Sequence, residues 1–218
     1  MFIVLKVFND GKLACFLGEE QGKFIAHYSL HRPYMRLAPG ALVEGDLSRA
    51  SGRYQRLDNV SLTYLGLARG HRQQFFLRFY LELAYLFLPQ HQSAEESFFF
   101  LRASLESTAL SWCDDRPSFG VVLSVFLLEI LGFSPPANIA TKVDIQHMLE
   151  NWDSWLELEK EGGDLTLPQA LVLKYDSLWG VSWMWISRCL SDHPQFKKIE
   201  KKWLGLLCEG SGAGYEKA

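Results

Sequence analysis

The sequence predicts an α+β protein in which a small N-terminal β-barrel precedes an all-helical domain. Two observations support this fold class. Up to about residue 70, short apolar or alternating segments recur at roughly ten-residue spacing and are separated by turn residues. From His71 onward, longer segments with helical periodicity follow, and Pro, Gly or capping residues bound most of them.

The first strands are defined by the turns between them. Asn9-Asp10-Gly11 tolerates the positive φ angles of a tight hairpin, and Gly18 to Gly22 forms a second turn. A loop from Leu30 to Pro39 follows the third strand. We therefore expect the first three strands at Phe2–Phe8, Leu13–Leu17 and Lys23–Tyr28.

The later strands complete the predicted barrel. Ala41–Ser48 alternates apolar and polar positions, and the Ser51-Gly52 turn leads into Arg53–Leu57. Val60–Leu67 is either the last strand or the approach to the helices. Five or six short strands of this kind are typical of a small closed barrel such as an OB-fold.

The helices are predicted from their stop and start residues. Arg72–Leu88 is apolar nearly all round, which indicates a buried helix that ends before Pro89. Ser93 is the expected N-cap of the next helix, with a Glu at N3. The helices after the first are expected at 93–113, 115–131, 143–161, 167–190 and 194–208.

We divide the chain into a barrel at 1–70, a helical domain at 71–208 and a disordered tail at 209–218. The charge is unevenly spread between these parts. Residues 1–70 hold nine Lys/Arg and six Asp/Glu, whereas residues 71–218 hold thirteen and nineteen. A basic front part followed by an acidic rear part indicates that phosphates would meet the barrel.

The cysteines and the apolar segments indicate a reduced, cytoplasmic protein. The four cysteines form no Cys-x-x-Cys pair, so zinc lacks its usual chelating spacing. Met1 to Phe8 is interrupted by Lys6 and does not resemble an export signal. The longest apolar runs, 75–88 and 121–133, are shorter than the roughly 20 residues that cross a bilayer. We expect no membrane association.

Catalytic chemistry has little support in the sequence. Common nucleophile-elbow, phosphate-loop, zinc-protease and dinucleotide motifs do not occur. The histidines are isolated, and the adjacent Asp114 and Asp115 stand at a predicted helix start, where carboxylates compensate the helix dipole. We predict a protein that is not an enzyme and that uses no cofactor or metal.

The basic residues of the front part are the candidate DNA-binding residues. Phosphate binding needs several cations on one surface, and exposed aromatic rings such as Phe24, Tyr28, Tyr34 and Tyr54 could stack on bases. The structural alternative is that the cations are solvated residues at hairpin ends and that the aromatic rings belong to the core. The candidate cations are Lys12, Lys23, Arg32, Arg36, Arg49, Arg53 and Arg56.

A second basic cluster lies in the last predicted helix. Lys197, Lys198 and Lys201 occupy one face, together with Lys202, and apolar residues occupy the other. Such a face is usually only solvated. The functional alternative is that these lysines form a second contact with DNA phosphates.

The order of features resembles the RecO family of DNA repair proteins, which mediate recombination. Gly22-Lys23-Phe24 and the loop at 31–36 resemble the family's OB-fold strand and basic loop, and 52–57 resembles a later strand. Phe126 to Phe133, followed by Pro135, resembles a family helix that ends in Leu-Gly-aromatic. The resemblance covers about residues 2–135. The chain lacks the zinc module that many members carry.

The resemblance implies that the protein binds single- and double-stranded DNA and promotes strand annealing. It further implies RecR and single-strand-binding protein as partners in recombinase loading, without covalent chemistry. The main alternative is a protein-interaction adaptor with an OB-like barrel and no DNA binding, which the overall net charge of −3 favours. Binding of a single-stranded oligonucleotide at low salt separates the two.

Overall fold

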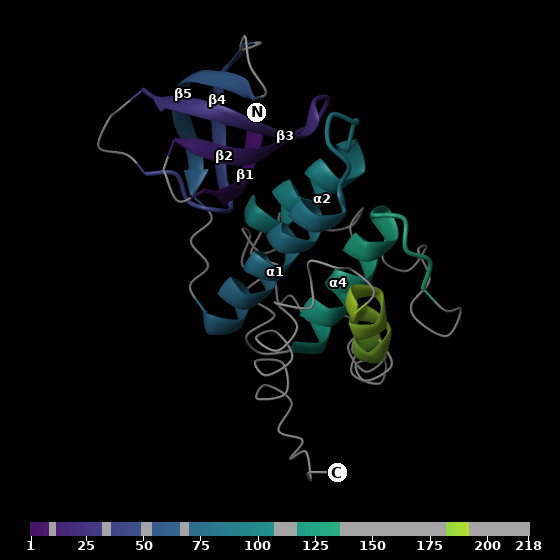
Figure 1. Ribbon diagram of the computed structural model, residues 1–218. Coiled ribbons are helices and arrows are strands. Elements are labelled where there is room, and N and C mark those ends of the chain that lie inside the picture. The colour runs from purple at the N-terminus through teal and green to yellow at the C-terminus, as the bar shows by residue number, and fades with distance from the viewer. Residues whose placement is uncertain are drawn as a thin grey trace, which may run out of the picture. The chain divides into compact units, whose positions relative to one another are not determined.

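The computed structural model describes residues 1–8, 12–31, 36–48, 54–65, 70–106, 117–135 and 182–191 (Figure 1). The chain divides into two compact units, Met1–Ser111 and Trp112–Ala218. Among its described residues the first unit holds five strands and two helices, and its extent passes beyond residue 70, where we expected a domain boundary. The predicted helices at 143–161 and 194–208 and the tail at 209–218 lie outside the described residues.

The first unit contains a closed, OB-like barrel with the strand order β1-β2-β3-β5-β4. β3 and β5 run parallel, and the other neighbours are antiparallel. This confirms the predicted barrel and its place before the helices. The strands are β1 Phe2–Val7, β2 Leu13–Gly18, β3 Gly22–Leu30, β4 Ala41–Ser48 and β5 Gln55–Leu65.

The barrel closes around alternate residues of each strand. Phe2, Phe16 and Phe24 lie at its centre, with the Phe24 ring centroid 5.5 Å from that of Phe2 and 5.6 Å from that of Phe16. Because side chains alternate across a strand, the residues between these core positions face outward. Phe24 is therefore part of the core and cannot stack on a base.

β5 corrects one sequence prediction. A strand at 53–57 was expected to end before 60–67, which was expected as either the last strand or the approach to the helices, yet β5 is continuous across Asp58 and Asn59. Asn59 adopts a φ of 54°, and the pairing with β4 shifts between Glu44 and Asp46. This geometry is a β-bulge, which accommodates one extra residue without ending the strand.

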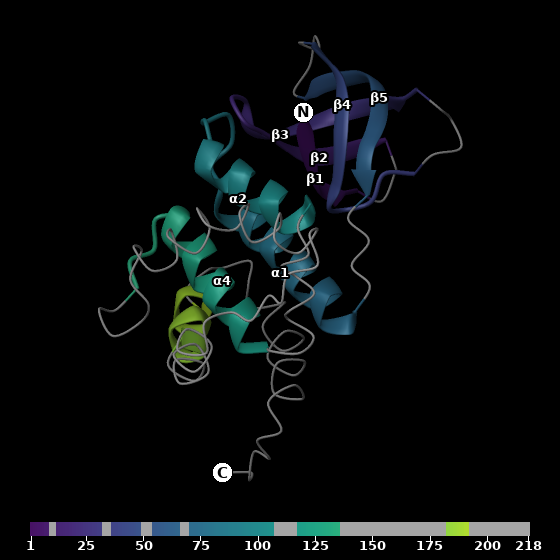
Figure 2. The same ribbon diagram turned by 180° about the vertical axis from the view of Figure 1, so that it is seen from behind.

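Helices α1 (His71–Phe87) and α2 (Glu95–Glu106) pack against the outer face of the barrel. Both views show them beside β1, β2 and β3, with β5 farther away (Figures 1 and 2). The outward-facing residues beneath them are apolar and at most 4% exposed: Ile3, Leu5, Cys15 and Leu17. As predicted, α1 ends before Pro89. α2 begins one residue later than expected, because its first helical hydrogen bond runs from the Phe98 amide to the Ala94 carbonyl at 2.8 Å, which makes Ala94 and not Ser93 the N-cap.

The second unit contains α4 (Pro117–Ile130) and a further helical segment at 182–191. Proline is well suited to the first position of α4, and Gly132, with a φ of 94°, ends it as the sequence predicted. The Phe133 amide donates to Leu128 at 2.9 Å, and the Gly132 amide donates to Glu129 at 3.0 Å, which is the Schellman pattern. Within the described part of the chain, no helix is long and apolar enough to cross a membrane.

Candidate nucleic-acid interface

Four of the ten predicted DNA-binding residues can be placed in the structure. These are Lys12, Lys23, Arg36 and Arg56, and they have unlike environments. The other six remain predictions, because they lie outside the described residues: Arg32, Arg49, Arg53, Lys197, Lys198 and Lys201.

Lys23 does not lie on the surface where we expected it. Its side chain is 7% exposed, and its Nζ donates a hydrogen bond to the Tyr85 carbonyl oxygen at 2.6 Å. Burial lowers the pKa of Lys23, and the charge of nearby Cys15 acts in the opposite direction. A phosphate cannot reach this ammonium, so we remove Lys23 from the candidate interface.

The position of Lys23 follows from the end of α1. The Tyr85 carbonyl would normally accept from the amide of residue 89, but residue 89 is proline and has no N–H. Lys23 supplies the missing donor and places a positive charge at the negative end of the helix dipole. α1 has no basic residue in its own last turn. Lys23 therefore stabilises the junction of helix and barrel.

The backbone around Lys23 completes this junction. The Lys23 carbonyl accepts the His91 amide at 2.9 Å, and Lys23 forms a parallel bridge with Gln90. Gly22 has a φ of 63°, and a Cβ there would collide with the Gln92 carbonyl. Each residue of Gly22-Lys23-Phe24 thus has a structural role. Gly22 allows the Gln92 carbonyl to approach closely, Lys23 caps the end of α1, and the Phe24 ring fills the barrel core.

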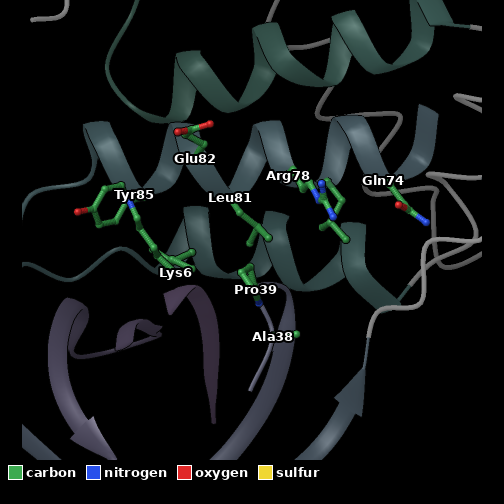
Figure 3. Close-up of a pocket in the computed structure, with 10 residues that line it drawn as sticks. Lys6, Ala38, Pro39, Gln74, Arg78, Leu81, Glu82 and Tyr85 are labelled. Atoms are coloured by element: carbon green, nitrogen blue, oxygen red, sulfur yellow. The ribbon is translucent and has the colours of Figure 1, made fainter. Parts of the chain in front are cut away.

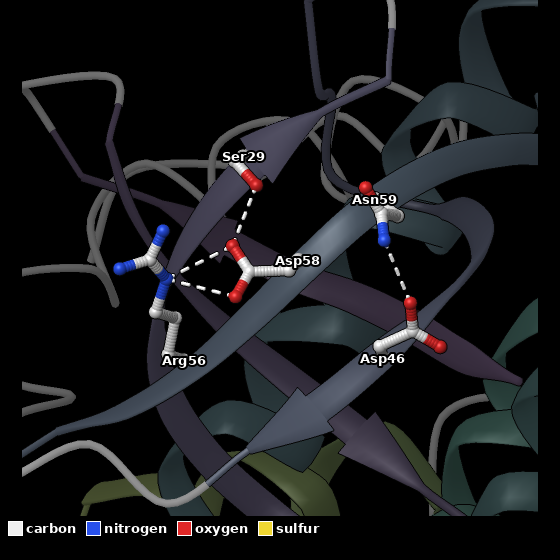
Figure 4. Close-up of polar contacts among 5 residues, drawn as sticks. All are labelled: Ser29, Asp46, Arg56, Asp58 and Asn59. Atoms are coloured by element: carbon white, nitrogen blue, oxygen red, sulfur yellow. Dashed lines mark hydrogen bonds and ion pairs between the residues drawn. The ribbon is translucent and has the colours of Figure 1, made fainter.

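Arg56 remains exposed, but it is not unpaired. Its side chain is 61% exposed, and its Nε contacts Asp58 at 2.8 Å from Oδ2 and 2.9 Å from Oδ1. The Ser29 hydroxyl donates to the same carboxylate at 2.7 Å. Figure 4 shows the two terminal nitrogens of Arg56 pointing away from Asp58. Arg56 can therefore present two nitrogens to a phosphate while Asp58 holds its Nε.

The hydrogen bonds also act on Asp58 itself. The bond from Ser29 lowers the pKa of Asp58, and Arg56 adds to this effect. A second acid lies nearby, because Asn59 donates to Asp46 at 2.8 Å (Figure 4). These carboxylates reduce the positive potential of this face.

The strand register brings several predicted residues into one row. Leu13 pairs with His27, His27 with Arg56, and Arg56 with Ser48. Lys12 lies at the end of this row, because its carbonyl accepts the Tyr28 amide at 3.0 Å. Exposed Lys12, one residue before Leu13, and exposed Arg56 thus lie at the two strands that flank β3.

The same row carries one aromatic pair. The His27 and Tyr54 rings lie edge to face with centroids 5.7 Å apart. His27 is exposed and Tyr54 is half-buried, so one of the predicted stacking residues lies at the surface. Tyr28 packs against Phe16 inside the barrel, and Tyr34 lies outside the described residues. We refer to Lys12, His27, Tyr54 and Arg56 as the barrel row.

Sequence reasoning missed two cations, Lys6 and Arg78, that line a pocket of about 450 Å³. Lys6 and Arg78 line this pocket, and Arg36 lies two residues before the lining residue Ala38 (Figure 3). All three cations are exposed, and among the described residues none forms an ion pair. The available signal was a cation within an apolar segment, at Lys6 in β1 and at Arg78 in α1.

Neither a protein-family model nor a curated protein sequence matches this chain.

Proposed function

We propose that the chain is a DNA-binding protein of DNA repair and recombination. In this proposal it binds single- and double-stranded DNA, promotes strand annealing, and acts with RecR and single-strand-binding protein to load recombinase. Holding two strands at one cationic surface would offset the repulsion between their phosphates. The proposed location is the cytoplasm, and the proposed role involves no catalysis.

The observation that supports this proposal is the barrel row on an OB-like barrel. Exposed Arg56 is in register with His27 of the His27–Tyr54 ring pair, and exposed Lys12 lies just before β2, so the barrel carries cations and an aromatic surface. OB-folds commonly bind oligonucleotides through a strand face and the adjoining loops. Tyr54 directly follows the segment 49–53 in the sequence, and that segment contains Arg49 and Arg53.

A direct test measures the binding of a labelled single-stranded oligonucleotide by fluorescence anisotropy at low salt. Charge reversal of Arg36 and Arg56 should weaken binding, because each change replaces an attraction to phosphate with a repulsion. Lys23→Met is the matched control, since the Lys23 ammonium is buried, and it should bind like the unchanged protein. Unchanged affinity after both reversals would contradict the proposal.

The adaptor alternative also has an observation in its favour. Asp58 neutralises part of the Arg56 charge, and Lys23 is withdrawn from the surface, so the cationic surface is smaller than the sequence suggested. An adaptor would show no binding to single-stranded DNA even at low salt while its thermal unfolding remains cooperative. That result would favour the adaptor over DNA binding.

A further inference from the structure

The pocket beside Lys6 is formed by β1, by residues 38–39 and by one face of α1 (Figure 3). Its volume of about 450 Å³ falls in the range of roughly 300–1,000 Å³ that is typical of small-ligand sites. Leu5, Leu77 and Leu81 form an apolar floor, each at most 6% exposed. A flat or apolar group in the pocket could therefore pack against buried leucine side chains.

The rim of the pocket is charged. Lys6 lies over the Tyr85 ring, with its Nζ 4.4 Å from the ring centroid, and it remains exposed to solvent. Arg78 stands on the α1 side of the pocket. Glu82 also lines the pocket, and Figure 3 shows its carboxylate on the side of α1 away from Pro39. Two cations and one acid leave a net positive rim.

We infer that this pocket receives one unstacked nucleotide of a single DNA strand. The base would lie against the leucine floor and Pro39, and the flanking phosphates would contact Lys6 and Arg78. This inference rests on the proposed DNA-binding function and adds a site that is separate from the barrel row. A purely apolar ligand would make no ionic contact with the two cations, whereas a nucleotide combines a flat apolar base with a negative phosphate.

The pocket then explains a preference between DNA forms. Bases in a duplex are stacked and paired, and removing one from the stack costs free energy. A single strand avoids most of this cost. The pocket should therefore favour single-stranded over double-stranded DNA, whereas the barrel row contacts the phosphates of either form.

The decisive comparison uses two oligonucleotides of about fifteen positions, a length within the span of OB-fold sites. One is oligothymidylate, and the other carries the same phosphates without bases. The full chain should bind the first about five- to hundredfold more tightly, because a stacked base contributes this much. Equal affinities would overturn the inference, while measurable binding of both would leave the proposed function intact.

Variants locate this difference in the pocket. Ala38→Phe fills the pocket without changing charge, so it should remove most of the advantage of the oligonucleotide with bases. Lys12→Gln should weaken both oligonucleotides alike, because Lys12 belongs to the barrel row. An advantage that Ala38→Phe leaves undiminished, in a protein with unchanged thermal unfolding, would place the base elsewhere and overturn the inference.

Surface variants keep the test valid if Ala38→Phe fails to fold. Lys6→Gln and Arg78→Gln each remove an exposed cation and should each reduce the salt dependence of binding by about one counterion. Unchanged salt dependence in both would contradict the pocket, while loss of binding with Lys12→Gln would still support the barrel row. If the unchanged protein binds neither oligonucleotide at low salt, the proposed function itself fails.

Discussion

At the scale of the residue, Lys23 is the clearest case of a side chain whose role depends on distant structure. A lysine in a short strand near a turn is normally solvated, and nothing in the local sequence says otherwise. Its partner is the Tyr85 carbonyl, 62 positions away, which lacks an intrahelical donor because of Pro89. The sequence contains both features, yet only the packing of α1 on the barrel brings them together.

Replacing Lys23 by methionine should therefore lower the free energy of unfolding. The change keeps the unbranched apolar stem of the side chain but leaves the Tyr85 carbonyl without its charged donor, which costs about 1–3 kcal/mol. Urea denaturation measures this loss. Lys12→Met is the control and should change stability by less than about 0.5 kcal/mol, because Lys12 is exposed. Equal stability of the Lys23→Met protein would mean that relief from burying the ammonium compensates for the lost bond.

The buried thiol of Cys15 predicts how the stability of the fold changes at alkaline pH. Its side chain is 1% exposed, and burial raises the pKa of its thiol to about 12, against the lowering effects of Lys23 and Lys6. Because the folded pKa lies above the unfolded value, the unfolded chain loses this proton first. The stability that depends on the buried thiol is present below pH 9 and falls by about 1.4 kcal/mol per pH unit above it.

The contribution of Cys15 can be isolated by comparison with Cys15→Ala. The lowered pKa of Lys23 has the opposite effect, since stability rises with pH between that lowered pKa and its ordinary value. Both proteins keep Lys23, so the difference in their unfolding free energies between pH 9 and 11 reports the thiol. Parallel pH profiles for the two proteins would show that Cys15 does not resist ionisation.

At the scale of the element, the strands were the most predictable part of the molecule. Glycine-containing turns and alternating side chains gave four of the strands to within two residues at either end, because these signals are local. β5 was divided incorrectly at Asp58 and Asn59, since polar turn residues also occur in β-bulges. Gly45 opposite the bulge is informative in retrospect, because a Cβ there would lie 2.9 Å from the Asp58 carbonyl.

Gly22 and Gly132 provide a matched pair of substitutions at element ends. Both have positive φ angles, but a Cβ on Gly22 would collide with the Gln92 carbonyl, whereas a Cβ on Gly132 would meet no atom within 4 Å. Gly132→Ala should cost about 1–2 kcal/mol from backbone strain alone. Gly22→Ala should cost clearly more, because β3 and the segment after α1 must also separate. Equal losses in thermal unfolding would contradict this account of the junction.

At the scale of the whole molecule, the structure changes how the chain should be divided for experiment. The predicted boundary at residue 70 follows the change from strands to helices. However, the outer face of β1 and β2 is apolar and lies against α1 and α2. Sequence patterns did not reveal this, because a strand with both faces buried resembles any short apolar run.

Truncation tests this division. A fragment of residues 1–111 should unfold cooperatively, since it contains the complete first compact unit. A fragment of residues 1–70 should lack a cooperative transition or aggregate, because it exposes Ile3, Leu5 and Leu17. Circular dichroism during heating distinguishes these outcomes. A cooperative 1–70 fragment would show that the barrel is stable without its helices.

The candidate site was less predictable than the fold. The sequence correctly indicated cations on the barrel, and Lys12, Arg36 and Arg56 are indeed exposed. It did not indicate which cations carry an acidic partner or lie buried, because those properties depend on register and on contacts between distant elements. Lys6 and Arg78 were missed for the same reason, since a pocket between a strand and a helix has no local sequence pattern.

The salt dependence of single-stranded DNA binding tests the central claim most directly. If exposed cations such as Lys12, Arg36 and Arg56 neutralise phosphates, the logarithm of the affinity should fall linearly with the logarithm of salt concentration. Three contacts give a slope of about −2 or steeper, at roughly −0.7 per phosphate. An affinity that does not change with salt, or the absence of binding at low salt, would contradict the claim that this protein binds DNA.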